Sequence, residues 1–227
     1  MGLKYSLPYD IYERHQKVGS FIKDSDTVLD VGGELDHLAK FCHPQKIIVA
    51  NLTTGDVIIP GDRLPFKNNS YSVVCAIDVL EHIEKPKRQK FIEELARVAS
   101  HIVILSFPIG TKKHVQFEKE IQTWLSSIGH QVIYLAEHIK YGLPTPEEVS
   151  NLTKNFNSQI AYSGNLQLNK FLFRVFLFDP KIKFVRKLVS KLKAAFNFLT
   201  NPIFYAILSN KSYSENVVRA YVIIEKK

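Results

Sequence analysis

The sequence predicts an α/β fold with a doubly wound, mostly parallel sheet at its centre. Three observations support this prediction. Short apolar runs alternate with segments of helical periodicity through the first half of the chain. Most of these runs are apolar throughout, which is typical of strands buried on both faces. The first of them, Thr27–Val31, passes directly into Gly32-Gly33, which indicates a tight turn from strand to helix.

Strands and helices are expected to alternate as far as Pro108. Tyr9–Ile22 has helical spacing, and a helix around Leu35–Cys42 is expected to stop near Pro44. Pro86 suits the first turn of a helix that runs to about Ala99. Apolar, β-branched composition predicts five strands: Thr27–Val31, Lys46–Ala50, Val57–Ile59, Tyr71–Ile77 and His101–Phe107.

The rhythm changes after Gly110. Helical spacing predicts helices at 115–128 and 146–156, with a loop at 135–144 between them, and a long helical region over 165–199 that is interrupted near Asp179-Pro180. Strands near 158–162 and 217–225 are expected to complete the sheet. We therefore expect one domain over residues 1–227, with a core at about 20–162 and 213–227 and a helical cap insertion at about 163–212.

Composition places the chain among ordinary globular proteins. It has 227 residues, of which 45% are hydrophobic and 23% charged. Cys42 and Cys75 are the only cysteines and lie in or beside apolar segments, so no disulfide framework is expected. The first residues lack the apolar core of a secretory signal. The sequence therefore predicts a cytoplasmic protein.

The net charge of +8 is concentrated in one segment. Residues 1–120 hold 16 basic and 16 acidic residues, whereas residues 121–227 hold 14 and 6. Six of those 14 lie between Lys181 and Lys193, and residues 181–199 also carry apolar side chains at helical spacing. We favour a cap helix with a solvated basic face. Peripheral contact with an anionic membrane is the alternative, and no motif supports a nucleic-acid partner.

The turn after the first strand indicates what kind of ligand binds there. In such folds ligands occupy the crevice at the carboxyl ends of the strands. The turn reads Gly32-Gly33-Glu34-Leu35-Asp36, without the Gly-x-Gly-x-x-Gly pattern of dinucleotide sites, and its two carboxylates would repel a pyrophosphate. A P-loop motif is also absent. These features favour a cofactor without phosphates.

Several motifs from Thr27 to Pro108 occur in an order that resembles a known family. They are Thr27–Gly33, Gly61-Asp62-Arg63-Leu64-Pro65-Phe66, Asn69–Val74, Asp78-Val79-Leu80-Glu81-His82-Ile83, Phe91–Val98 and Ile102–Pro108. Together they resemble the class I S-adenosylmethionine-dependent methyltransferases with a Leu-Glu-His-Ile-type signature, of the type 11 group. The resemblance implies a Rossmann-like sheet of seven strands with an antiparallel last strand, and S-adenosylmethionine as cofactor.

The same resemblance assigns roles to residues at the strand ends. It implies that Asp30 lies beneath the methionine end of the cofactor, that Gly32 and Gly33 let the backbone approach it, and that Asp78 faces its sulfonium part. Asp62 would accept a hydrogen bond from the adenine amino group. Asp30 and Asp62 could instead be turn residues.

Two departures from the family pattern concern cofactor affinity. Glu34 and Asp36 stand where further glycines are common, and Asn51 stands where an acid usually holds the ribose hydroxyls. Asparagine offers one acceptor group and one donor group, so it can still bind the diol, although less tightly. These residues keep open the interpretation of a fold retained without activity.

Histidines near the strand ends are the candidate bases for acceptor activation. His82 follows the fourth strand, and Glu81 beside it is a further candidate for which a structural role is favoured. His138 lies in the run Glu137-His138-Ile139-Lys140-Tyr141-Gly142-Leu143-Pro144. That run resembles a segment of methyltransferases associated with cell-surface saccharide synthesis, which implies that Glu137, His138 and Tyr141 face the acceptor. His114 and Glu118, which follow the fifth strand, are expected to border the site. A structural role is the alternative for His82 and His138, and the histidine spacing predicts no metal.

The favoured function is methyl transfer from S-adenosylmethionine to a small-molecule or saccharide-type acceptor. Two alternatives remain. One is a non-catalytic interaction module that keeps the fold and uses its basic cap for contact with a membrane or a protein. The other is a nucleotide-dependent oxidoreductase, which would bind a nicotinamide dinucleotide in the same crevice.

Overall fold

The protein has one seven-stranded sheet in the order β3-β2-β1-β4-β5-β7-β6. The computed structural model describes residues 3–59, 63–129, 132–177 and 179–226. Strands β1 to β5 are parallel, and β7 runs antiparallel between β5 and β6. The strands are β1 (Thr27–Val31), β2 (Lys46–Asn51), β3 (Val57–Ile58), β4 (Tyr71–Ile77), β5 (Ala99–Pro108), β6 (Asn157–Ser163) and β7 (Arg219–Glu225). The predicted fold class is confirmed.

Helices connect the strands, and most follow the predicted segments. The α-helices are α1 (Tyr9–Gly19), α2 (Lys85–Val98), α3 (Lys112–Ser127), α4 (Ile133–Tyr141), α5 (Pro146–Thr153), α6 (Leu166–Leu177) and α7 (Lys183–Leu208). Short 3-10 helices occur at η1 (Leu3–Ser6), η2 (Leu38–Lys40) and η3 (Leu80–His82).

Two sequence predictions about helices were wrong. The helix expected over 35–42 is only the single turn η2, because Asp36 takes a positive φ of 66° and breaks the helical run before it starts. The segment 135–144 was expected to be a loop, but most of it is the end of α4. Exposed residues of that helix include Ile133 and Ile139 as well as Lys140, whereas His138 is buried, so it lacks a clear apolar face. Gly142, at φ 74°, ends it.

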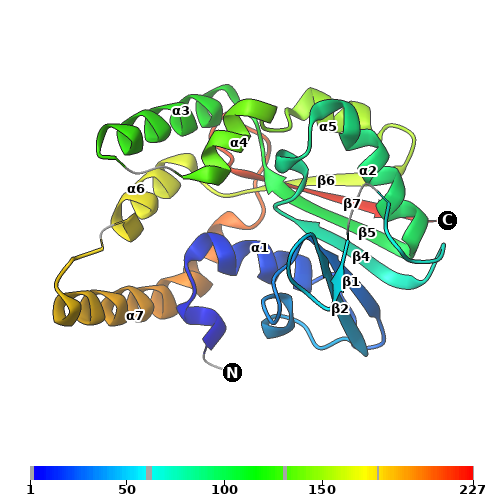
Figure 1. The fold of residues 1–227 in the computed structure, drawn as a ribbon, viewed down its shortest axis with the longest axis horizontal. Coiled ribbons are helices and arrows are strands. Elements are labelled where there is room, and N and C mark those ends of the chain that lie inside the picture. The colour runs from blue at the N-terminus through cyan, green and yellow to red at the C-terminus, as the bar shows by residue number, and fades with distance from the viewer. Residues whose placement is uncertain (1–2, 60–62, 130–131, 178, 227) are drawn as a thin grey trace.

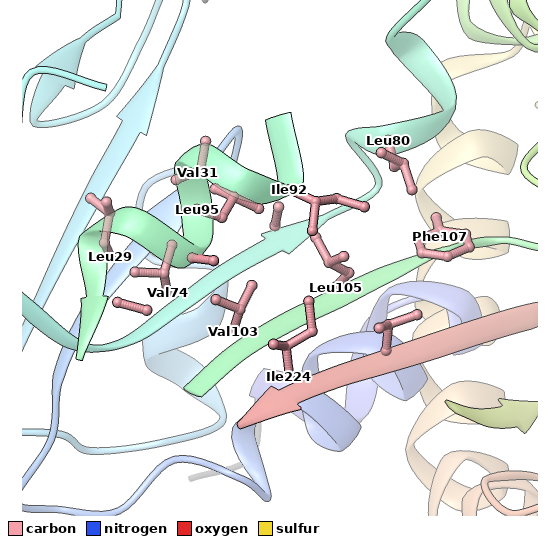
Figure 2. Close-up of a cluster of buried hydrophobic side chains, with 14 of the residues drawn as sticks. Leu29, Val31, Val74, Leu80, Ile92, Leu95, Val103, Leu105, Phe107 and Ile224 are labelled. Atoms are coloured by element: carbon pink, nitrogen blue, oxygen red, sulfur yellow. The ribbon is translucent and has the colours of Figure 1, made fainter. Parts of the chain in front are cut away.

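Alternate residues of the strands pack against helices on opposite faces of the sheet. Leu29, Val31 and Val74 contact the α2 side, where Ile92 and Leu95 complete the cluster drawn in Figure 2. On the other face, Val28, Val73 and Cys75 pack with Val18 of α1 and Leu38 of η2. This alternation follows from the two-residue period of a strand. It also directs Asp30 toward the α1 face, next to Val28 in that layer.

The segment between β6 and β7 holds α6 and α7. The C-terminal part of α7 is anchored to the N-terminal segment: Asn201 Nδ2 donates to the carbonyls of Tyr5 and Leu7, each at 2.9 Å, and Asn197 Nδ2 donates to Ser6 at 3.1 Å. The N-terminal part of α7 extends away from the sheet (Figure 1). Within the described ranges, no helix combines the length and apolar character needed to cross a membrane.

Candidate functional site

The order of the strands places a crevice between β1 and β4. From β1 the chain builds outward through β2 and β3, then returns to place β4 on the other side of β1. The connections after β1 and β4 therefore leave in opposite directions, which opens a crevice at the carboxyl ends of these two strands. Gly32 and Gly33 follow β1, and Asp78 follows β4, so the topology brings these predicted residues to one edge.

The Gly32-Gly33 turn has no room for side chains. Gly32 has φ 80°, and a Cβ there would overlap the side chain of Val79. A Cβ on Gly33 would overlap the carboxylate of Asp30. The turn is held by Gly32 N–H, which donates to the Ala50 carbonyl at 2.7 Å. Both positions therefore require glycine, and their partly exposed backbone is what a ligand would meet.

Asp30 lies beneath this turn rather than on its surface. Its side chain is fully buried, and its Oδ2 atom has no hydrogen-bond partner among the described residues. Its Oδ1 atom accepts only a weak hydrogen bond from Cys75 Sγ at 3.6 Å. Burial raises the pKa of Asp30 to about 7. Any effect of Asp30 on a ligand therefore acts through the turn above it.

Asn51, at the end of β2, is also bound to the turn. Its Nδ2 donates to Gly33 O at 2.9 Å and to Gly32 O at 3.2 Å. Its Oδ1 accepts from Leu52 N–H at 2.6 Å. Both amide hydrogens are therefore used within the protein, and a diol at this position would find only the remaining acceptor capacity of Oδ1. Asp62, predicted for the adenine side, lies outside the described residues.

Asp78 is bound by two arginines that lie far from it along the chain. Arg14 Nη1 of α1 lies 2.8 Å from Asp78 Oδ2, and Arg219 of β7 donates to both carboxylate oxygens. Burial alone would raise the pKa of Asp78, but Arg14 and Arg219 outweigh it and lower the pKa to about 2. Arg219 is buried and also pairs with the buried Glu13, 3.7 Å away. The carboxylate of Asp78 therefore stays ionised. Its backbone has a positive φ of 55°.

A cavity of about 410 Å³ opens beside Asp78. Its polar side is formed by Asp78, Glu81, His82 and His138, together with His114 and Glu118 of α3. Leu168, Leu172, Phe173 and Phe176 of α6 form an apolar wall. Helix α6 thus closes one side of the cavity, which the sequence alone did not indicate. The volume suits a small organic molecule.

Two of the predicted histidines lie together at this cavity. The rings of His82 and His138 are 5.0 Å apart, although they come from η3 and α4. His82 Nδ1 contacts Glu137 Oε2 at 2.7 Å, and His138 Nδ1 contacts Glu118 Oε1 at 2.9 Å. The Nε2 atom of His138 is buried without a partner in the described structure. Both rings are therefore fixed by a carboxylate at Nδ1 and free at Nε2.

The other residues predicted to face the acceptor differ in their positions. His114 reaches the cavity but is buried, with Nδ1 bonded to the Ile109 carbonyl at 3.0 Å, and burial lowers its pKa. Glu137 and Tyr141 do not line the cavity: Glu137 orients His82, and Tyr141 O–H lies 3.3 Å from Lys140 Nζ. Glu118, expected only to border the site, lies at the cavity and takes the place expected for Glu137 beside His138.

Glu81 is a further buried acid at the cavity. Its side chain is 1% exposed, and its Oε2 atom has no partner among the described residues. Burial, and then the neighbouring charge of Asp78, raise its pKa well above the ordinary value. From the sequence, Glu81 is a candidate base beside His82, with a structural role as the favoured interpretation.

The geometry agrees with the comparisons to known proteins. Residues 26–105 match a methyltransferase domain. This domain spans the glycine turn, Asp78 and the first five strands. A comparison of the chain with curated proteins found no match.

Solved structures of methyltransferases share the fold over nearly the whole chain. A SAM-dependent methyltransferase from Archaeoglobus fulgidus is 12% identical, with a TM-score of 0.57, and the match covers 96% of this chain and 94% of that one. A possible histamine N-methyltransferase from Thermotoga maritima is 13% identical, with a TM-score of 0.53 and coverage of 99% and 92%. At these identities the likeness concerns the fold, which is the Rossmann-like fold of S-adenosylmethionine-dependent methyltransferases.

A third structure of this fold contains the cofactor. It is phosphoethanolamine N-methyltransferase 2 from Haemonchus contortus in complex with S-adenosyl-L-methionine, 14% identical, with a TM-score of 0.54 and coverage of 92% of this chain and 50% of that one.

The crevice between β1 and β4 has residues that fit this cofactor. The turn at Gly32 and Gly33 is free of side chains, and Glu34 does not fill it, because its side chain is 73% exposed and pairs with His37 at 3.4 Å. Asp78 remains 23% exposed at the mouth of the cavity. The weak point is Asn51, whose amide hydrogens are used by the turn. The residues therefore fit the cofactor, although Asn51 could offer a ribose only part of its hydrogen-bonding capacity.

Proposed function

We propose that the chain is an S-adenosylmethionine-dependent methyltransferase that acts on a small-molecule acceptor in the cavity beside Asp78. The observation that carries this proposal is a side-chain-free glycine turn within the matched methyltransferase domain, next to a cavity of about 410 Å³ lined by oriented histidines. The alternative from the sequence, a module without activity, gives no reason for this cavity. A nicotinamide dinucleotide is disfavoured because Glu34 and Asp36 flank the turn.

The residues around the crevice would divide the work. Gly32, Gly33 and Asn51 would hold the cofactor, with Asp30 supporting the turn from below and Asp78 at the methyl-donating end. The bound cofactor supplies a methyl group that is already activated on a sulfonium. The chain would then have to align an acceptor and remove its proton. His138 is the residue we propose to activate an acceptor hydroxyl, since Glu118 fixes its ring and leaves Nε2 free.

Calorimetric titration with S-adenosylmethionine and S-adenosylhomocysteine tests this function. We expect wild-type protein to bind both and Gly32→Val to lose binding by at least about 100-fold, because the new side chain would displace Val79 and the turn. Gly129→Ala is the control: this glycine also has a positive φ, but no atom lies within 4 Å of its missing Cβ. Failure of wild-type protein to bind either compound, or preferential binding of NAD(H), would contradict the proposal.

The polarity of the cavity lining limits the class of acceptor. Its apolar wall from α6 and its polar floor at His82 and His138 suit an amphipathic molecule with a hydroxyl group. A saccharide linked to a lipid has this character, in keeping with the resemblance of residues 137–144 to enzymes of cell-surface saccharide synthesis. We propose this acceptor type as the first to screen.

We propose in addition that α7 contacts an anionic membrane surface. Large apolar residues form one continuous stripe along it at spacings of three or four, and each is at least 39% exposed: Phe184, Leu188, Leu192, Phe196, Leu199, Ile203 and Ile207. A cap helix would bury such a stripe. Exposed lysines, including Lys183, Lys187 and Lys191, flank it. An apolar stripe bordered by basic residues is typical of helices at membrane interfaces.

Liposome flotation checks the membrane contact. We expect the protein to float with vesicles that contain phosphatidylserine and much less with neutral vesicles. Changing Lys183, Lys187 and Lys191 to Glu should lower partitioning at least about tenfold, since each basic residue near an anionic surface contributes roughly 1 kcal/mol. Lys23, Lys112 and Lys119, all exposed but on other elements, provide a control with the same charge change. Equal flotation of the two variants would refute the contact.

A further inference from the structure

We propose that Glu81, His82 and His138 form a binding site for a divalent transition-metal ion at the floor of the cavity. One ligand atom from each residue lies within 4.8 Å of the others. Two histidines and one carboxylate are a donor set that binds Zn²⁺ and related ions such as Co²⁺, Mn²⁺ and Fe²⁺. The sequence did not predict this group, because His138 is far from the other two along the chain and joins them only through α4. The site does not depend on methyl transfer.

Unpartnered buried atoms are the first argument for an ion. Glu81 Oε2 and His138 Nε2 are both buried and lack a hydrogen-bond partner in the described residues. Glu81 is 1% exposed and His138 is 7% exposed. Leaving such atoms unsatisfied costs roughly 1–3 kcal/mol each, so two of them on residues of one cavity indicate a missing partner. A cation would satisfy both, and a neutral ligand could satisfy them only with separate donors.

The orientation of the two imidazoles is the second argument. Glu118 holds Nδ1 of His138 at 2.9 Å, and Glu137 holds Nδ1 of His82 at 2.7 Å. In each ring, therefore, Nε2 remains for an ion. Histidines that bind metals commonly donate their other N–H to a carboxylate in this way, which fixes the tautomer and the ring orientation. Two such pairs at one site are not required by a purely structural role.

The charges and the space around the site also suit a cation. Arg14 and Arg219 also line the cavity, but they pair with Asp78 and Glu13, so Glu118 adds a negative charge that neither arginine compensates. Metal–nitrogen and metal–oxygen bonds of about 2.1 Å keep ligand atoms within roughly 4.2 Å of each other. The three ligand atoms, which lie within 4.8 Å of one another, would therefore move slightly closer together around an ion. Three protein ligands leave coordination positions open toward the cavity, where an acceptor oxygen could bind and lose its proton more easily. His138 Nε2 is the base proposed above only in the metal-free protein, because with an ion bound its lone pair would be used by the metal.

Binding of metal to the full chain tests the site without any measurement of activity. Apo protein would be titrated with Co²⁺, followed by visible d–d absorption, and with Zn²⁺, followed by calorimetry. We expect one ion per chain, with a dissociation constant below about 10 μM. Mg²⁺, which prefers oxygen ligands, should not compete at similar concentrations. Absence of a saturable Co²⁺ spectrum at one equivalent would overturn the proposal.

Variants separate this site from adventitious binding by surface histidines. Glu81→Gln and His138→Gln should each weaken Co²⁺ binding at least about tenfold, and Glu118→Gln should weaken it about 10–100-fold through the orientation of His138. His82→Gln provides a variant at a half-exposed position if the buried ones do not fold. His101→Gln, on an exposed residue elsewhere, is the control. Unchanged binding in all of the site variants would refute the assignment.

Discussion

Replacing Arg88 by Met is expected to lower the free energy of unfolding by about 3–5 kcal/mol. Arg88 of α2 is completely buried, yet it carries a charge. It donates to the Ile83 carbonyl at 3.0 Å, to the Gly142 carbonyl at 2.5 Å and to Glu148 Oε1 at 2.7 Å. Methionine fills a similar volume but leaves these acceptors without a donor. Unpaired buried acceptors, and an acid without its cation, account for the large expected loss.

This loss is measured by urea unfolding of four proteins: wild type, Arg88→Met, Glu148→Gln and the double variant. The four values also give the part of the loss that is due to the Arg88–Glu148 pair. We expect the two single changes to be strongly non-additive, because either one breaks the same ion pair. Arg97→Met is the matched control on the same helix. Arg97 also bonds to two carbonyls and a glutamate, but its side chain is 21% exposed, so water can replace it and the loss should stay below about 2 kcal/mol. Equal losses for Arg88→Met and Arg97→Met would contradict the interpretation.

Arg88 also bears on the site. Its three main partners lie directly after His82, at the C-terminal end of α4 and at the start of α5. It therefore joins the two elements that carry His82 and His138. Nothing in the local sequence of α2 indicates this role, since a basic residue on an amphipathic helix is ordinarily solvated.

The sheet was predictable from the sequence because its signals are local. A strand buried on both faces is apolar throughout, and the glycine pair after Val31 marks the turn, so β1, β2, β4 and β5 were found within a few residues. Helix α4 was missed for the same reason. Without a clear apolar face, and with a glycine and a proline after it, the segment resembles a loop when only neighbouring residues are considered.

The site was only partly predictable, because much of it depends on contacts between distant segments. Residues that follow strand ends, such as Gly32 and Asp78, could be placed by topology alone. The arginines that hold Asp78 come from α1 and β7, and Glu118, the partner of His138, comes from α3. No spacing rule connects these residues. The group of Glu81, His82 and His138 likewise becomes visible only after α4 packs against η3.

Asp30→Asn is expected to stabilise the protein increasingly as the pH rises from about 4 to 7. Burial raises the pKa of Asp30 from its ordinary value of about 3.8 to about 7, so in this range the folded protein binds a proton that the unfolded chain has released. Stability due to the protonated acid is complete below about pH 4 and is lost as the pH rises through 7. With 1.36 kcal/mol for each pKa unit, the loss approaches about 4 kcal/mol. Asparagine has nearly the same shape and no charge to bury.

Urea unfolding of both proteins at pH 5, 6, 7 and 8 gives the difference directly. The gap between Asp30→Asn and wild type should widen up to pH 7 and then stay constant, because above that pH both the folded and the unfolded carboxyl are ionised. Asp24→Asn, which removes one charge from an exposed position nearby, corrects for the change in net charge. If the free energies of unfolding of wild type and Asp30→Asn changed in parallel with pH, ionisation of Asp30 would cost little. The turn or solvent would then supply its Oδ2 atom with a partner.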